Sequence, residues 1–109
     1  MNETLLVITN LPDAPSAAQL AQQIIEASAA ACVNQLAPCN STYRWQGKIE
    51  SATEITLLIK TTRAAYPRLE KLILVAHPYE LPEIIAVPLT AGLPAYLNWI
   101  DNETTITKD

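Results

Sequence analysis

The sequence of 109 residues contains no Phe, only two Gly and a single His. Two glycines are too few for a glycine-rich phosphate-binding loop, and one His cannot form a histidine pair at metal-ligand spacing. Basic residues are also scarce, because seven Lys and Arg stand against eleven Asp and Glu, for a net charge of −4. A nucleic-acid-binding surface needs clustered positive charge, so we predict no nucleic-acid partner.

Long hydrophobic runs are absent from the N-terminal region, where the apolar stretch spans only Leu5–Ile8. That stretch is too short for a secretion signal or a membrane span, so we expect a cytoplasmic protein with no membrane partner. In a reducing compartment, Cys32 and Cys39 are expected to be free thiols. Along one extended strand they would lie roughly 23 Å apart at about 3.3 Å per residue. A disulfide needs Cα atoms within about 7 Å.

Half of the sequence is hydrophobic and 17% is charged, which is typical of a folded domain. The length predicts one domain spanning residues 1–109. Asp13 is expected to cap the first helix. The strand over Glu3–Asn10 is expected to be buried on both faces, and the strand over Glu83–Pro88 is expected to be another short buried strand. The expected elements are a strand over Glu3–Asn10, a helix after Asp13, a hairpin of Cys32–Trp45 and Lys48–Thr61, a helix over Arg63–Ala76, a strand over Glu83–Pro88, a helix over Gly92–Ile100 and a weak edge strand around Thr104–Thr107.

This order of elements predicts an α+β fold, a ferredoxin-like β-α-β-β-α-β sandwich with an extra C-terminal helix. The predicted hairpin is unusually long for a domain of this fold. Arms of about fourteen residues span roughly 46 Å, whereas a compact domain of this length is about 34 Å across. The hairpin should therefore extend beyond its own domain, and we expect another subunit to cover it. A β-bulge is expected where Cys39 follows Pro38.

The segment His77–Glu83 holds the only His, two carboxylates and two prolines that stiffen the backbone. An imidazole and a carboxylate suit a divalent metal such as copper or zinc. Alternatively, His77 only ends the preceding helix and Glu83 only begins the next strand. The residues alone leave both alternatives open.

No catalytic motif is present, because there is no nucleophile elbow and the single His has no Ser or Cys at triad spacing. We therefore predict that the protein is not an enzyme. Tyr43 and Trp45 near the hairpin tip either line a ligand pocket or pack across an interface. Lys60 is expected to be solvated unless a neighbouring subunit places an anion opposite it.

Five segments between Leu5 and Ile100 together resemble one known family. They are Ala31–Asn34, Tyr43–Glu50, Glu54 to Thr61, His77–Tyr79 with Pro82 and Glu83, and Tyr96–Ile100. In this order they are similar to the CutA family of divalent-cation tolerance proteins. The resemblance implies a cytoplasmic homotrimer of ferredoxin-like subunits, similar in architecture to the PII-type signalling trimers. It also implies that the long hairpins pair across subunits.

The resemblance implies a metal site that this chain only partly matches. Family members linked to copper imply a Cys where this chain has Thr9, a His where it has Ala76, and a Glu at the position of Glu83. His77, the motif's own His, is also present. Loss of the two softer ligands predicts weak binding of Cu(II) or another divalent metal through His77 and Glu83. No cofactor is expected to be required for folding.

The resemblance further implies a cleft between subunits around Trp45, Lys60, Tyr79 and Glu83. We therefore predict a trimeric divalent-cation (copper) tolerance protein of the CutA type. The alternative is a PII-like trimeric signalling adaptor that binds a small ligand in this cleft, with a protein partner that the sequence does not identify. A third hypothesis is a trimeric scaffold with an indirect effect on metal tolerance.

Overall fold

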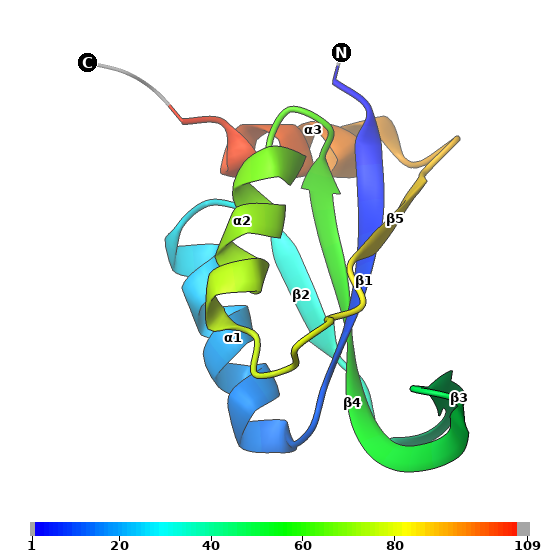
Figure 1. The fold of residues 1–109 in the computed structure, drawn as a ribbon. Coiled ribbons are helices and arrows are strands. Elements are labelled where there is room, and N and C mark those ends of the chain that lie inside the picture. The colour runs from blue at the N-terminus through cyan, green and yellow to red at the C-terminus, as the bar shows by residue number, and fades with distance from the viewer. Residues whose placement is uncertain (1, 107–109) are drawn as a thin grey trace.

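The computed structural model describes residues 2–106, and the elements follow the predicted order (Figure 1). The sheet is antiparallel in the order β2-β4-β1-β5, and β3 pairs with the outer part of β4. This is the predicted ferredoxin-like α+β arrangement. The strands are β1 (Thr4–Leu11), β2 (Cys32–Gln35), β3 (Cys39–Trp45), β4 (Lys48–Thr62) and β5 (Ile85–Pro88), and the helices are α1 (Ala14–Glu26), α2 (Tyr66–Ala76) and α3 (Pro94–Thr104).

Helices α1 and α2 cover one face of the sheet, and the hydrophobic core lies between them and the strands. Side chains alternate along β1, so that Leu5 and Val7 are buried against the helices whereas Leu6 and Ile8 are only half-buried. The core is aliphatic, as expected from the absence of Phe. Its largest fully buried side chains include Leu11, Ile24, Leu57, Ile59, Leu69 and Ile73.

The observed ends of the helices agree only in part with those predicted from the sequence. Asp13 caps α1 as predicted, with its carboxylate accepting a hydrogen bond from the Ser16 amide at 2.8 Å. Helix α2 was predicted to begin at Arg63 but begins at Tyr66, after a turn over residues 63–65. The weak strand predicted around Thr104–Thr107 is wrong for the part described here, because Thr104 ends α3. Thr107 lies outside the described residues.

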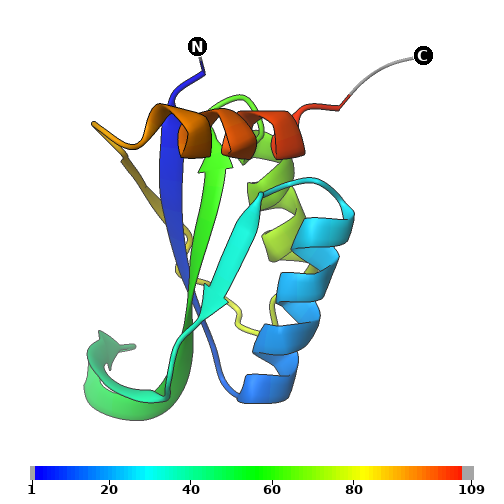
Figure 2. The same cartoon turned by 180° about the vertical axis from the view of Figure 1, so that it is seen from behind.

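The other face of the sheet is largely uncovered (Figure 2). Helix α3 crosses one end of it, and the rest of the strands has no helix above it. Within this chain, the prediction that the strand over Glu3–Asn10 is buried on both faces is therefore wrong, as is the prediction that the strand over Glu83–Pro88 is buried. Strand β5 is exposed along its whole length, because it forms the sheet edge and pairs only with β1. Ile85 and Val87 keep 52% and 46% of their surface exposed.

The first arm of the hairpin is divided into two strands. Between Gln35, opposite Leu57, and Cys39, opposite Glu54, the first arm advances four residues while β4 advances three. The extra residue is a β-bulge beside Cys39, as predicted. Pro38 contributes to the interruption because it has no amide hydrogen for the ladder.

The outer part of the hairpin extends away from the compact domain (Figure 1). The molecule measures 48 Å along its longest axis but only 30 and 23 Å along the others. Most side chains of β3 and of the outer half of β4 are exposed. The prediction that the hairpin extends beyond its own domain is confirmed.

Candidate functional site

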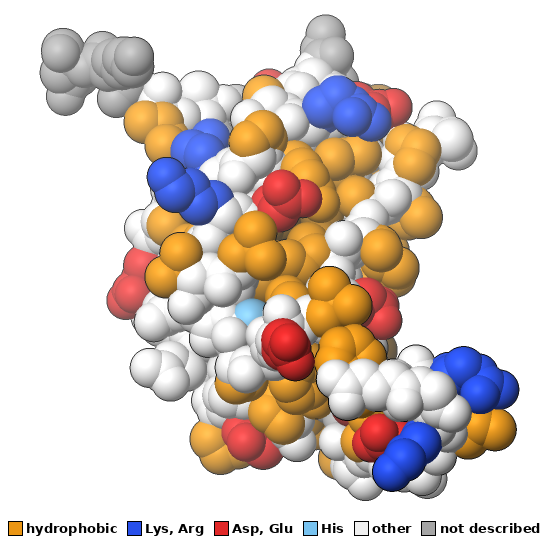
Figure 3. All heavy atoms as spheres, viewed as in Figure 1, with side chains coloured by type: hydrophobic (Ala, Val, Ile, Leu, Met, Phe, Trp, Pro, Cys, Tyr) orange, Lys and Arg blue, Asp and Glu red, His pale blue; other side chains and the backbone are white. Residues whose placement is uncertain are grey.

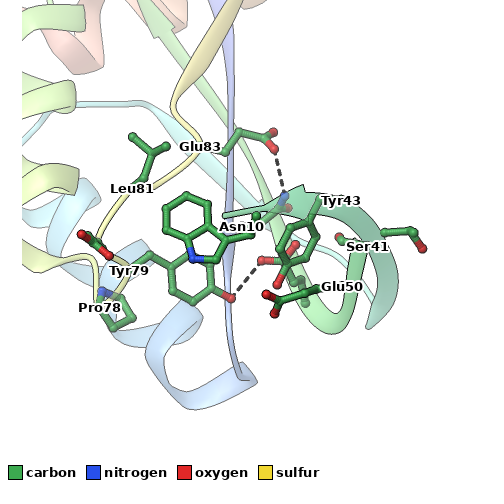
Figure 4. A pocket seen from close by; sticks show the side chains of 12 residues that line it. Asn10, Ser41, Tyr43, Glu50, Pro78, Tyr79, Leu81 and Glu83 are labelled. Atoms are coloured by element: carbon green, nitrogen blue, oxygen red, sulfur yellow. Dashed lines mark hydrogen bonds between the residues drawn. The ribbon is translucent and has the colours of Figure 1, made fainter. Parts of the chain in front are cut away.

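A cavity of about 630 Å³ lies between the hairpin and the segment that follows α2 (Figure 4). Trp45, Tyr79 and Glu83, three of the residues predicted for a cleft, line it. Lys60 is not among its lining residues. Its ammonium group lies beside α3, where Nζ donates to the Tyr96 hydroxyl at 3.4 Å.

The hairpin brings its polar and aromatic side chains to this cavity through strand register. Tyr43 lies opposite Glu50, and Cys39 lies opposite Glu54. Paired residues of an antiparallel ladder point to the same face, and that face repeats at every second residue. Tyr43, Glu50 and Glu54 therefore share one face of the hairpin, which curves toward Tyr79 (Figure 4).

Glu54 is the most deeply buried carboxylate of the site, at 8% exposure. Its Oε2 accepts a hydrogen bond from the Tyr79 hydroxyl at 2.9 Å. Burial raises the pKa of Tyr79, and the negative Glu54 beside it raises this pKa further. Tyr79 is therefore a neutral hydrogen-bond donor at physiological pH.

His77 lies behind the cavity at 8% exposure, and both ring nitrogens have partners. Nε2 is 2.7 Å from the main-chain oxygen of Asn10, and Nδ1 is 3.2 Å from the main-chain nitrogen of Tyr79. A carbonyl only accepts and an amide only donates, so Nε2 carries the proton and Nδ1 is the acceptor. Burial lowers the pKa of His77, which keeps the ring neutral.

Asn10, at the end of β1, connects the other groups of the site. Its Nδ2 donates to Glu83 Oε1 at 3.2 Å, and its Oδ1 accepts from the Thr56 hydroxyl at 2.6 Å. The Thr56 hydroxyl lies 3.7 Å from the Cys39 sulfur. His77 and Glu83, which were predicted to act together, therefore both contact Asn10, one through its main chain and the other through its side chain.

The cavity is negatively charged. Glu50, Glu54, Glu80 and Glu83 line it, and no Lys or Arg from the described part of the chain does. Across residues 2–106 the only ion pair joins Arg63 and Glu3, which lie elsewhere. The site therefore favours a positively charged ligand.

The fit of the site to a metal ion is poor for tight binding. Within the described part of the chain, no group of three or more His, Cys, Asp or Glu side chains could hold a metal ion. Neither nitrogen of His77 has a free lone pair, and Glu83 is already bonded to Asn10. The two positions at which the resemblance implies a Cys and a His hold Thr9, which is fully buried, and Ala76, which is exposed.

Sequence reasoning had not singled out Asn10, Glu50 or Glu54 as functional residues. A signal existed for Glu54, because a carboxylate stands in the alternating pattern of β4 between Ala52 and Thr56 on the half-buried face. Asn10 gave no comparable signal, since a polar residue at a strand end is ordinary. Only the fold shows that its main chain and side chain serve different partners.

The surface of the molecule shows where hydrophobic and charged side chains lie on one face (Figure 3). Figure 3 shows hydrophobic side chains over the middle of one face, between α2 and β5, and acidic side chains near its lower part. Basic side chains lie at the end of the hairpin and also at the upper left and top of this face. Within residues 2–106, no helix is both long enough and apolar enough to cross a membrane.

Nearly the whole chain matches one protein family. Residues 5–103 match the family described as CutA1 divalent ion tolerance protein. The chain belongs to this CutA1 family. The resemblance found in the sequence is thereby confirmed.

Individual CutA proteins cover the chain almost completely. The divalent-cation tolerance protein CutA of Thermus thermophilus is 38% identical over 99 residues, which make up 91% of this chain and 96% of that protein. Protein CutA, chloroplastic, of Arabidopsis thaliana is 36% identical over 101 residues, but these are only 56% of its length. The crystal structure of CutA from Xylella fastidiosa superimposes with a TM-score of 0.91 at 45% identity, covering 94% of this chain and 98% of that one. The CutA fold therefore extends over the chain.

Proposed function

We propose that this protein is a homotrimeric divalent-cation tolerance protein that binds divalent metal ions weakly and has no catalytic activity. Membership of the CutA1 family supports the role in cation tolerance. The observation on which the binding part rests is the cavity lined by four glutamates without a Lys or Arg. A negative cavity of this kind raises the local concentration of cations.

In this proposal Glu83 and His77 supply the metal-binding donors. Glu83 is exposed at the cavity and must release the Asn10 amide, while His77 must release the Tyr79 amide to free Nδ1. Each donor therefore loses a hydrogen bond when it binds an ion, which lowers the affinity. An imidazole and a carboxylate together suit Cu(II) or Zn(II).

Calorimetric titration of the metal-free protein with Cu(II) and Zn(II) tests this assignment. We expect saturable, weak binding of one ion per chain that is lost in a His77→Ala/Glu83→Ala double variant. Glu103→Ala, which removes an exposed carboxylate from α3, should bind like the unaltered protein. Absence of binding, or equal binding in the double variant, would contradict the assignment.

The uncovered sheet face supports the trimer. It carries Leu6, Ile8, Leu58, Ile85 and Val87 in neighbouring register positions. Exposed apolar surface of this extent is typical of protein interfaces. The hairpin supports the same proposal, because a two-stranded ribbon outside the domain is marginally stable by itself.

Sedimentation equilibrium tests the oligomeric state. We expect a mass three times the 11.9 kDa of the chain. Ile85→Glu should lower this mass toward that of one chain, because it places a charge on the uncovered face. Leu74→Glu is the matched control, since Leu74 on α2 is 55% exposed and Ile85 is 52% exposed. A monomeric unaltered protein, or the same shift in both variants, would overturn the trimer.

A PII-like signalling adaptor that binds a small ligand is the second candidate. The volume of the cavity favours it, because about 630 Å³ accommodates a small molecule rather than only an ion. A screen in which no metabolite raises the melting temperature would count against this candidate.

For location, we propose the cytoplasm. Cys32 and Cys39 are both free thiols, which supports a reducing compartment. The Arabidopsis relative is named as chloroplastic, so location differs within the family. Fractionation of the source cells, with recovery of the protein in a membrane or secreted fraction as the contrary result, decides the question.

A further inference from the structure

The cavity contains a buried negative charge that has no positive partner among residues 2–106 of the chain. Glu54 is 8% exposed, and the Tyr79 hydroxyl that donates to it is neutral. No Lys or Arg forms an ion pair with Glu54 in the described range 2–106. A buried carboxylate without a cation is costly, and a bound cation would remove much of this cost.

The walls around Glu54 favour an organic cation over a metal ion. Tyr43, Trp45 and Tyr79 line the cavity with aromatic rings, whose faces attract ammonium groups. A hard metal ion instead needs several oxygen ligands at short distance. No cluster of three acidic, His or Cys side chains close enough for that exists among residues 2–106. The volume of about 630 Å³ is also that of a small-molecule site.

Figure 4 shows how the labelled side chains surround this space. Tyr79 lies on one side, and its hydroxyl points toward the carboxylate that it binds. Tyr43 and Glu50 lie across from it on the hairpin, and Glu83 lies at the edge formed by the segment before β5. Carboxylates therefore line the cavity together with the aromatic rings and Leu81, which provide apolar contact.

We propose that this cavity binds a small organic cation of the alkylammonium class. Glu54 pairs with the positive charge, and the rings of Tyr43, Trp45 and Tyr79 contact the carbon groups around it. The lining residues named here all belong to one chain, and the proposal does not depend on metal binding by His77 and Glu83.

A charged probe and its neutral isostere test the role of charge. Choline and 3,3-dimethylbutan-1-ol have the same shape, but only choline is charged. Calorimetry at constant ionic strength should show saturable binding of choline at one molecule per chain and no binding of the alcohol. Putrescine, a primary diamine, should compete with choline. Equal binding of the alcohol would show an apolar pocket only and overturn the proposal, as would absence of choline binding.

Substitution of Glu54 tests the position of the site. Glu54→Gln keeps an oxygen for the Tyr79 hydroxyl but removes the charge, so choline affinity should fall by about tenfold or more. Glu70→Gln is a matched control, because Glu70 accepts a hydrogen bond from the Tyr66 hydroxyl at the same 2.9 Å but lies on α2, outside the cavity. The choline affinity of the Glu70→Gln variant should equal that of the unaltered protein. Equal affinities in the two variants would overturn the proposal.

Two further measurements keep the test decisive. Trp45→Leu should weaken choline binding several-fold even if Glu54→Gln fails to fold, and an unchanged affinity would contradict the aromatic contact. Titration with Cu(II) separates this proposal from the metal site. Choline binding without Cu(II) binding supports the organic-cation site and contradicts the metal assignment, whereas Cu(II) binding without choline binding gives the opposite result.

Discussion

Replacement of Thr9 by Val should stabilise the protein. Thr9 lies near the end of β1, is fully buried, and its hydroxyl has no hydrogen-bond partner within the described structure. A hydroxyl buried without a partner costs roughly 1–3 kcal/mol relative to water. Val has the same β-branched shape and replaces the hydroxyl by a methyl group, so the substitution removes the unpaired polar group and leaves the volume nearly unchanged.

We expect Thr9→Val to raise the free energy of unfolding by about 1 kcal/mol. For a domain of this size that corresponds to an increase of the melting temperature by about 4 °C or more. Thermal and urea unfolding at equal protein concentration measure the change, because an oligomer's stability depends on concentration.

Thr61→Val is the matched control for this substitution. Thr61 is equally buried, in β4, but its hydroxyl donates to the Ala29 main-chain oxygen at 2.7 Å. The same substitution there should lower stability by about 1–3 kcal/mol, because it leaves a buried carbonyl unpaired. If Thr9→Val destabilises the protein as much as Thr61→Val does, the assignment of an unsatisfied hydroxyl is wrong.

The remaining predictions concern pH and the turns. Burial lowers the pKa of His77 below its ordinary 6.5, so as the pH falls the unfolded chain takes up a proton before the folded chain does. The stability of the metal-free protein should therefore fall as the pH drops through 6.5 toward the lower pKa of the folded state. His77→Gln removes the only His and should abolish this part of the pH dependence of urea unfolding; an unchanged pH profile would refute it. Gly47→Ala should lower stability by about 1 kcal/mol, since Gly47 has φ +81° in open space and the cost is purely conformational; an unchanged urea midpoint would contradict this. Asp13→Ala should lower the melting temperature at neutral pH, because the Ser16 amide donates to the capping carboxylate and lowers its pKa. The difference in melting temperature from the unaltered protein should shrink well below pH 3.8, where the carboxylate is protonated. A difference that stays constant with pH would show that the cap does not cause it.

Much of the fold could be predicted from local patterns. Ala17, Leu20 and Ile24 repeat at helical spacing and are the buried residues of α1. Pro78 marks the end of α2, and the alternation of Ile55, Leu57 and Ile59 marks the buried face of β4. Errors arose where burial depends on distant elements. Strand β5 was predicted to be buried because it is apolar, but its position at the sheet edge leaves it exposed in the chain.

The candidate site could be predicted only in part. The cleft between subunits around Trp45, Lys60, Tyr79 and Glu83 stays a prediction, because it needs a second subunit. Within one chain, Trp45, Tyr79 and Glu83 line one cavity, whereas Lys60 lies beside Tyr96 of α3. Lys60 lies six residues beyond Glu54 on β4, which is about 20 Å along an extended strand, so within one chain it does not reach the cavity.

The sequence by itself determined the order of the elements, the aliphatic core and the negative charge, because these depend on composition and on periodicity along the chain. Tertiary structure alone decided which donors are free. His77 and Glu83 were identified from the sequence as possible metal-binding groups, yet both form hydrogen bonds with groups that come from other parts of the site. Glu54 shows the converse, since an ordinary residue of a strand becomes a buried, unpaired charge when the hairpin folds over Tyr79. Hydrogen-bond satisfaction and burial depend on neighbours in space, and the fold determines those neighbours.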